Sequence, residues 1–151
     1  MSEHWIVLIP ENPRDVPAKQ LQERARVRFV EIAPNADAFD VRISEGIEFV
    51  DCGGNFESVR CPACCREIPI DWWADRMDED PSEAGYRLTH FPMPCCVSER
   101  SLNDLHYVWP QGFARVALEA MNPNIGMLDE VSKLEFEEIL GTKIRIIHRH
   151  I

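Results

Sequence analysis

Two tight groups of cysteines are the residues in this sequence whose type and spacing point most directly to chemistry. Cys61 and Cys64 form a C-x-x-C pair, and Cys95 and Cys96 follow further along the chain as adjacent residues. Structural zinc sites usually hold the ion tetrahedrally by four thiolate or imidazole ligands, and a C-x-x-C turn lets two sulfurs reach one ion. The sequence therefore predicts a structural Zn²⁺ in a zinc-ribbon-like module, with Cys61, Cys64, Cys95 and Cys96 as ligands.

The second cysteine group departs from the usual pattern and leaves alternatives open. Adjacent cysteines bind one ion only if the backbone bends sharply between them, a bend that Pro92 and Pro94 would favour. His90 could replace one of the pair, and Cys65 and Cys52 are further reserve ligands. Cys65 stands where such turns often have glycine. Cys52 ends an apolar strand, so we favour a buried, small hydrophobic side chain there.

Other cysteine chemistry is also compatible with part of the pattern. A disulfide framework is typical of secreted chains, and no export signal is seen. A redox-active Cys61-Pro62-Ala63-Cys64 pair would need to open a helix, whereas Ile68-Pro69 interrupts any helix soon after it. These two interpretations remain alternatives to zinc.

The sequence favours a protein that is not an enzyme. A four-sulfur zinc site has no open ligand position, whereas a zinc enzyme acting on a small molecule would need one, with a nearby carboxylate such as Asp71 or Glu67. The H-x-E motif of base deaminases, H-E-x-x-H and Gly-rich phosphate loops do not occur. His148 and His150 share one face of a terminal strand and could bind a metal, but we favour a solvated strand end.

A tryptophan pair beside an acidic run is the candidate surface for a partner. Trp72 and Trp73 could cover the cysteine module, which has little core of its own. If exposed with Asp75, Asp78 and Asp80, they would instead anchor a basic protein.

Charge and length exclude several classes of protein. The 151 residues include 16 Lys and Arg against 26 Asp and Glu, for a net charge of -10. Such a charge opposes binding to a nucleic-acid backbone and favours a basic partner. No apolar run approaches the roughly 18 residues of a membrane span, and the N-terminus lacks the features of a signal peptide. We therefore expect a cytoplasmic protein of one domain, residues 1–151.

Apolar periodicity and turn residues predict the elements that must position the cysteines. A strand at Trp5 to Ile9 should be central in its sheet, because it is apolar throughout. Ser44-Glu45-Gly46 should form a hairpin turn between the strands Phe39 to Ile43 and Ile47 to Cys52. The remaining predicted elements are a helix from Pro17 to Ile32, a strand from Tyr86 to Phe91, a helix from Phe113 to Met121, a helix ending at Gly141 and a strand from Lys143 to Ile151.

The helix before Gly141 carries signals at both ends. Ser132 and Glu135 predict a capping box, Val131 should pack on Phe136 as a hydrophobic staple, and Gly141 marks the exit.

This order predicts an α+β fold: a mixed sheet with helices packed on one face, ferredoxin-like in topology. Residues 55–110 hold five of the six cysteines and few regular elements, so they are predicted to be a cysteine-rich zinc module inserted within the single domain.

Most of the chain resembles an uncharacterised bacterial family of small, acidic, single-domain proteins. The residues that carry the resemblance are Trp5-Ile6-Val7 with Pro10, Phe49-Val50-Asp51-Cys52-Gly53, Cys61-Pro62-Ala63-Cys64, Pro94-Cys95-Cys96, Ser101-Leu102-Asn103-Asp104-Leu105 and Trp109-Pro110-Gln111-Gly112-Phe113-Ala114. The resemblance implies a single bacterial cytoplasmic domain. The family has no assigned activity, so the resemblance adds no mechanism. Together with the cysteines and the charge, it favours a zinc-stabilised, non-enzymatic protein that binds a basic partner, as an inhibitor or immunity protein would.

Overall fold

The computed structural model describes residues 2–151 and is built on a four-stranded sheet. The strand order is β10 (Ile144–His150), β1 (His4–Pro10), β9 (Gly112–Met121) and β2 (Ala38–Val50), and each strand is antiparallel to its neighbours. Helix α1 (Lys19–Ile32) follows β1, and helix α3 (Glu130–Leu140) follows β9. The combination of helices and sheet is confirmed, but the sheet is antiparallel where a mixed one was predicted.

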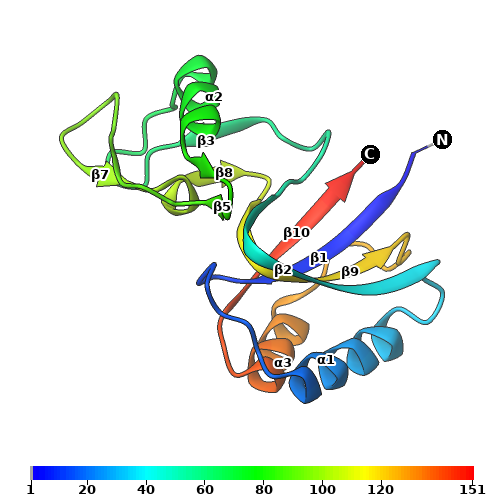
Figure 1. The fold of residues 1–151 in the computed structure, drawn as a ribbon. Coiled ribbons are helices and arrows are strands. Elements are labelled where there is room, and N and C mark those ends of the chain that lie inside the picture. The colour runs from blue at the N-terminus through cyan, green and yellow to red at the C-terminus, as the bar shows by residue number, and fades with distance from the viewer. Residues whose placement is uncertain (1) are drawn as a thin grey trace.

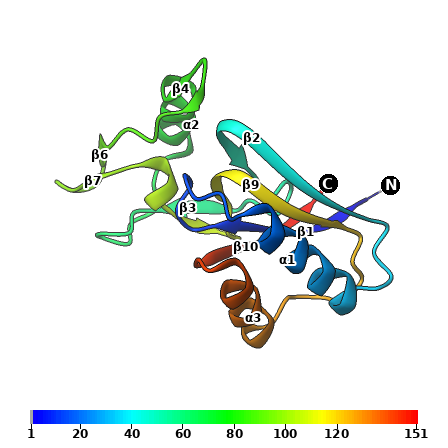
Figure 2. The same ribbon diagram turned by 60° about the horizontal axis from the view of Figure 1, so that its bottom comes forward.

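Both of these helices cover the same face of the sheet (Figures 1 and 2). Phe29 of α1 and Phe136 of α3 meet edge to face with their ring centroids 5.4 Å apart. They pack on Leu8 of β1 and Leu118 of β9 in one buried cluster. Burial of several large apolar side chains, each contributing about 1.5 to 3 kcal/mol, holds this layer together.

Strand β1 is central, as its apolar run predicts. Ile6, Val7, Leu8 and Ile9 are all at most 2% exposed. Ile6 and Leu8 face the helices, while Val7 and Ile9 join a second cluster on the other face of the sheet. A strand covered on both faces has no polar alternation, which explains its continuous apolar sequence.

The predicted hairpin around Ser44-Glu45-Gly46 is wrong. The two segments form one long strand, β2, and both pair with β9, with a shift in register between Ile43 and Glu48. A Cβ atom at Gly46 would overlap the carbonyl oxygen of Ala84. The glycine therefore allows another segment to cross the strand closely and does not turn the chain.

The helix predicted from Phe113 to Met121 is also wrong, because these residues form β9. Nearly every residue of this strand is buried. A strand buried on both faces carries apolar residues at nearly all positions, here all except Arg115 and Glu119, so the spacing of Phe113, Val116, Ala117 and Ala120 matched a helix by coincidence. Pairing with β1 and β2 on its two sides fixes the extended conformation.

Helix α3 is present, but its first turn differs from the prediction. Asp129 is the N-cap, and its carboxylate accepts a hydrogen bond from the Ser132 backbone N–H at 2.8 Å. Ser132 therefore lies inside the helix and is not the N-cap of the predicted capping box. Val131 is 66% exposed, so the predicted staple on Phe136 does not form. Gly141 ends the helix in the left-handed conformation with φ of 69°, as predicted.

The segment between β2 and β9 forms a lobe at the curved end of these two strands (Figure 1). Its elements are short: β3 (Ser58–Arg60), α2 (Ile70–Glu79), β4 (Pro81–Ser82), β5 (Gly85–Tyr86), β6 (Phe91–Pro92), β7 (Glu99–Arg100), the 3-10 helix η1 (Leu102–Asp104) and β8 (His106–Val108). The predicted strand from Tyr86 to Phe91 is absent apart from its two ends. Helix α2 was not predicted.

Arg145 of β10 joins this lobe to the sheet. Its guanidinium donates to Asn103 Oδ1 at 3.2 Å, to the Gln111 carbonyl at 2.8 Å and to the Asn103 carbonyl at 3.3 Å. Asn103 Oδ1 also accepts from the Phe113 backbone N–H. Gly112 lies against this group, because a Cβ there would stand 2.5 Å from an Arg145 nitrogen.

We predict that Gly112→Ala lowers the free energy of unfolding by about 2 kcal/mol, because the added methyl group displaces the guanidinium from its acceptors. Urea unfolding measures the effect. Gly54→Ala is the matched control, since a Cβ there meets its nearest atom at 3.5 Å. Its stability should change by less than about 1 kcal/mol. Equal losses in the two variants would contradict the role of Gly112.

Candidate metal centre

The first pair of cysteines lies on a tight loop that leaves strand β3. The Cys61 backbone N–H donates to the Arg66 carbonyl, and the Cys65 N–H donates to the Cys61 carbonyl, both at 2.9 Å. An isolated bridge between Arg60 and Glu67 closes the base of the loop. These bonds fold the chain back within one turn, so Cys61 and Cys64 project to the same side.

Cys65 adopts a backbone conformation that glycine usually occupies. Its φ of 64° lies in the left-handed region. Glycine often occupies this position in such turns, and the left-handed conformation of Cys65 gives the reason.

The second pair of cysteines lies at the tip of the hairpin formed by β6 and β7. Phe91 pairs with Arg100 and Pro92 with Glu99, and the Met93 N–H donates to the Ser98 carbonyl at 2.9 Å. The hairpin turn supplies the sharp bend that adjacent ligands require. Ser98, which sequence reasoning missed, places its hydroxyl 3.2 Å from the Cys96 sulfur.

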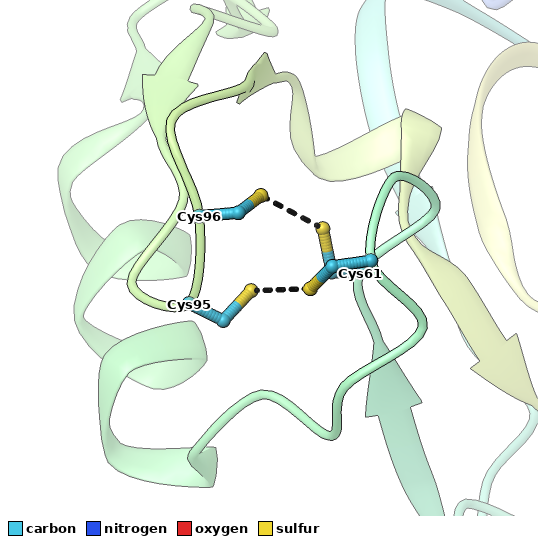
Figure 3. A group of neighbouring side chains, drawn as sticks. Cys61, Cys95 and Cys96 are labelled. Carbon is cyan, nitrogen blue, oxygen red and sulfur yellow. Dashed lines mark hydrogen bonds between the residues drawn. The ribbon is translucent and has the colours of Figure 1, made fainter.

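The two loops face each other, with Cys61 on one and Cys95 and Cys96 on the other (Figure 3). Together with Cys64 they bring the four predicted ligands into one group. The sulfurs of Cys61 and Cys96 are 3.8 Å apart, and those of Cys64 and Cys95 are 3.2 Å apart. All four Sγ atoms lie within 4.8 Å of one another. In the described residues, this is the single group of three or more His, Cys, Asp or Glu side chains close enough to share one ion.

The spacing of these sulfurs fits a tetrahedral zinc ion. Zn–S bonds of about 2.3 Å place the corners of a tetrahedron about 3.8 Å apart. The pairs at 3.2 and 3.8 Å and the limit of 4.8 Å for all four thiols are compatible with that arrangement, and all four cysteines are free. The geometry can therefore hold one metal ion in a closed shell of sulfur.

The reserve ligands lie outside the group. His90 is 66% exposed, and its Nε2 lies 3.8 Å from Asp104 Oδ2. Cys65 is exposed beside the loop. Cys52 is fully buried at the end of β2 among apolar side chains, as favoured, and burial raises the pKa of its thiol to about 11.

The local environment favours the thiolate form at some positions and opposes it at others. Burial raises the pKa of Cys61, but hydrogen bonds from the backbone N–H groups of Cys64 and Ala63 outweigh it and lower the pKa overall. A hydrogen bond with Ser98 lowers the pKa of Cys96. Burial and the neighbouring thiols raise the pKa of Cys95. A bound cation would offset the repulsion among four thiolates, so metal uptake releases protons.

The tryptophan pair covers the lobe. Trp73 stacks on Phe56 at 5.3 Å between ring centroids, and its indole N–H donates to the Tyr107 hydroxyl at 3.1 Å. Trp72 packs against the buried apolar cluster of the lobe, and its ring centroid lies 5.2 Å from Cζ of the Arg76 guanidinium. Both rings thus pack on the apolar core of the lobe, which includes the buried side chains of Val59, Ile68 and Leu102 and is larger than the sequence predicted.

The predicted acidic residues divide into two kinds. Asp75 and Asp78 are exposed on α2. Asp80 is only 2% exposed, and its carboxylate accepts the backbone N–H groups of Leu88 and Thr89 at 2.8 and 2.9 Å. Asp80 therefore orders the following segment and is no part of an acidic surface.

The carboxylates expected of a zinc enzyme stand outside the cysteine group. Neither Asp71 nor Glu67 belongs to the cysteine group within the described residues, and four sulfurs leave no ligand position open. The loop that holds Cys61 and Cys64 leads back to the Arg60–Glu67 bridge, and α2 begins only at Ile70. The helix that a thioredoxin-like motif opens is thus missing after Cys64.

Comparisons with protein-family models, curated proteins and solved structures gave no match. The resemblance to a bacterial family therefore has support only in the cysteine group, which is compatible with a zinc module. None of the helices in residues 2–151 is long and apolar enough to cross a bilayer.

We predict that the purified protein contains one zinc ion per chain and that chelation strongly lowers its melting temperature, because metal affinity contributes directly to folding. Cys95→Ser should lose the zinc. Cys65→Ser is the matched control, since it makes the same change beside a predicted ligand, and it should keep the zinc. Elemental analysis and thermal melts measure both effects, and zinc retention in Cys95→Ser would contradict the ligand set.

We also predict that Cys65→Gly raises the free energy of unfolding by about 0.5 to 1 kcal/mol, because glycine lacks the Cβ that opposes a left-handed conformation. Cys65→Ala, which keeps a Cβ, serves as the control and should be unchanged. Denaturant unfolding of the zinc-loaded proteins compares them. Equal stability of the Gly and Ala variants would contradict backbone strain at this position.

Proposed function

We propose that this protein is a zinc-stabilised, non-enzymatic protein that binds a basic protein partner. An inhibitor or immunity protein for a basic target would act in this way. The observation that carries the proposal is the group of four thiols, all within 4.8 Å, which can close around an ion and leave no position for a substrate. Such a site stabilises a fold and leaves function to the surface around it.

Zinc is the ion that the donor set favours. Thiolates select zinc, Cu(I) and iron–sulfur clusters, and a tetrahedral group of four sulfurs is typical of structural zinc. The site requires reduced thiols, which supports the expected cytoplasmic location.

Helix α2 carries the surface that we propose for the partner. Asp71, Asp75, Asp78 and Glu79 are exposed along it. Arg76 is held by Glu79 at 2.7 Å and lies near the Trp72 ring, so it does not neutralise the remaining carboxylates. In a chain of net charge -10, this helix would attract a basic protein and speed its association.

Two further assignments belong to the same proposal. We take residues 55–110 as a zinc module inserted in one domain, residues 1–151. We also assign the sheet and its two helices to the ferredoxin-like class. The order strand, helix, strand, strand, helix, strand, with the first and third strands adjacent in the sheet, supports this assignment.

Charge reversal on α2 tests the proposed surface. Immobilised zinc-loaded protein is incubated with a lysate of the cells that make it, and retained proteins are identified by mass spectrometry. We expect a basic protein that is retained at low salt and lost at high salt. The double variant Asp75→Lys/Asp78→Lys should retain at least tenfold less of it.

The double variant Glu31→Lys/Glu138→Lys is the matched control, because it makes the same charge change at exposed positions on α1 and α3. It should retain the partner as the unaltered protein does. Equal loss in both variants would indicate a general charge effect and contradict a specific surface on α2. Retention of the partner by the α2 variant would contradict the surface as well.

A further inference from the structure

His4 and His150 lie opposite each other where the two ends of the chain meet. They are direct partners in the register of β1 and β10. The backbone hydrogen bonds next to them join Glu3 and Ile151 in both directions, at 2.8 and 2.9 Å. His4 and His150 are therefore a non-hydrogen-bonded pair of the antiparallel ladder, the kind in which side chains approach most closely.

The two imidazole rings present nitrogen atoms to each other. Nδ1 of His4 and Nδ1 of His150 are 3.3 Å apart, and the ring centroids are 4.5 Å apart. Zinc binds imidazole nitrogen at about 2.0 to 2.1 Å, so two nitrogens on one tetrahedral ion stand about 3.3 to 3.4 Å apart. The pair thus has the separation of two ligands on a shared ion.

The surroundings hold the pair in place and leave it accessible. The His4 N–H donates to Asn122 Oδ1 at 2.9 Å, and the His150 carbonyl accepts the Gly54 N–H at 2.7 Å. A cavity of about 510 Å³, lined in part by His4, Trp5 and Trp109, adjoins the site. An ion could enter from solvent and keep water on its remaining positions.

We propose that His4 and His150 form a second metal site, independent of the cysteine centre, for a borderline divalent cation such as Ni²⁺, Cu²⁺ or Zn²⁺. Imidazole suits these ions, whereas Mg²⁺ prefers oxygen ligands. Within residues 2–151 no third His, Cys, Asp or Glu side chain joins the pair. The site therefore binds more weakly than the four-sulfur centre.

Calorimetric titration of the zinc-loaded protein with Ni²⁺ tests this proposal. We expect one Ni²⁺ per chain, and a melting temperature that rises with Ni²⁺ because the ion joins the first and last strands. His4→Gln and His150→Gln should each weaken Ni²⁺ binding at least tenfold. His148→Gln is the matched control, since this histidine lies on the same strand outside the pair, and its binding should be unchanged.

Three results would overturn the proposal. The first is no uptake of Ni²⁺ by the zinc-loaded protein, which would leave only two tilted imidazole rings that share a hydrogen bond. The second is an equal loss of binding in His148→Gln and His4→Gln. The third is equally tight binding of Mg²⁺. Melts recorded without Ni²⁺ establish that each variant is folded before its affinity is compared.

Discussion

The lobe depends on the meeting of two loops that carry four thiols. Its strands β4, β5, β6 and β7 have two residues each, β3, β8 and η1 have three, and its longest described element is α2, with ten. Elements so short form few backbone hydrogen bonds and cannot order a segment by themselves. Cys61, Cys64, Cys95 and Cys96 belong to the apolar cluster at its centre. An ion bound by all four would tie the first loop to the hairpin and add a constraint to the packing of this cluster.

The sheet determines where this centre stands. Strands β2 and β9 curve together and carry the lobe at their end (Figure 2). Gly46 and Gly85 let the lobe cross β2 closely, since a Cβ on either would meet backbone atoms of the other segment. Arg145 adds a charged link, with three hydrogen bonds to Asn103 and Gln111. The cysteine loops are therefore positioned by a rigid layer whose stability comes from ordinary apolar packing.

Local signals in the sequence predicted the parts of the molecule that local physics determines. The cysteine spacing gave the four residues that the structure brings together, and the apolar runs gave β1, α1 and β10. The errors have tertiary causes. Phe113 to Met121 is apolar except at Arg115 and Glu119 because β9 is buried on both faces, and that removes the alternation by which a strand is recognised. Gly46 was interpreted as a turn residue, but in the structure its missing side chain allows the segment at Ala84 to pass close to β2. The meeting of His4 with His150 depends on long-range pairing that no local pattern contains, whereas Asp80 accepts hydrogen bonds from Leu88 and Thr89, only eight and nine residues further along the chain.

The proposed role of the cysteine centre requires zinc in a shell of four sulfurs. X-ray absorption at the zinc edge of the purified protein tests this most directly, because it reports the type, number and distance of the ligands. We predict four sulfur atoms at about 2.3 Å and no nitrogen or oxygen neighbour. A shell with nitrogen or oxygen in place of one or more sulfurs would contradict a closed structural centre. It would favour the alternative of a zinc enzyme with an open ligand position. Absence of the metal from protein purified with reduced thiols would contradict the zinc site altogether.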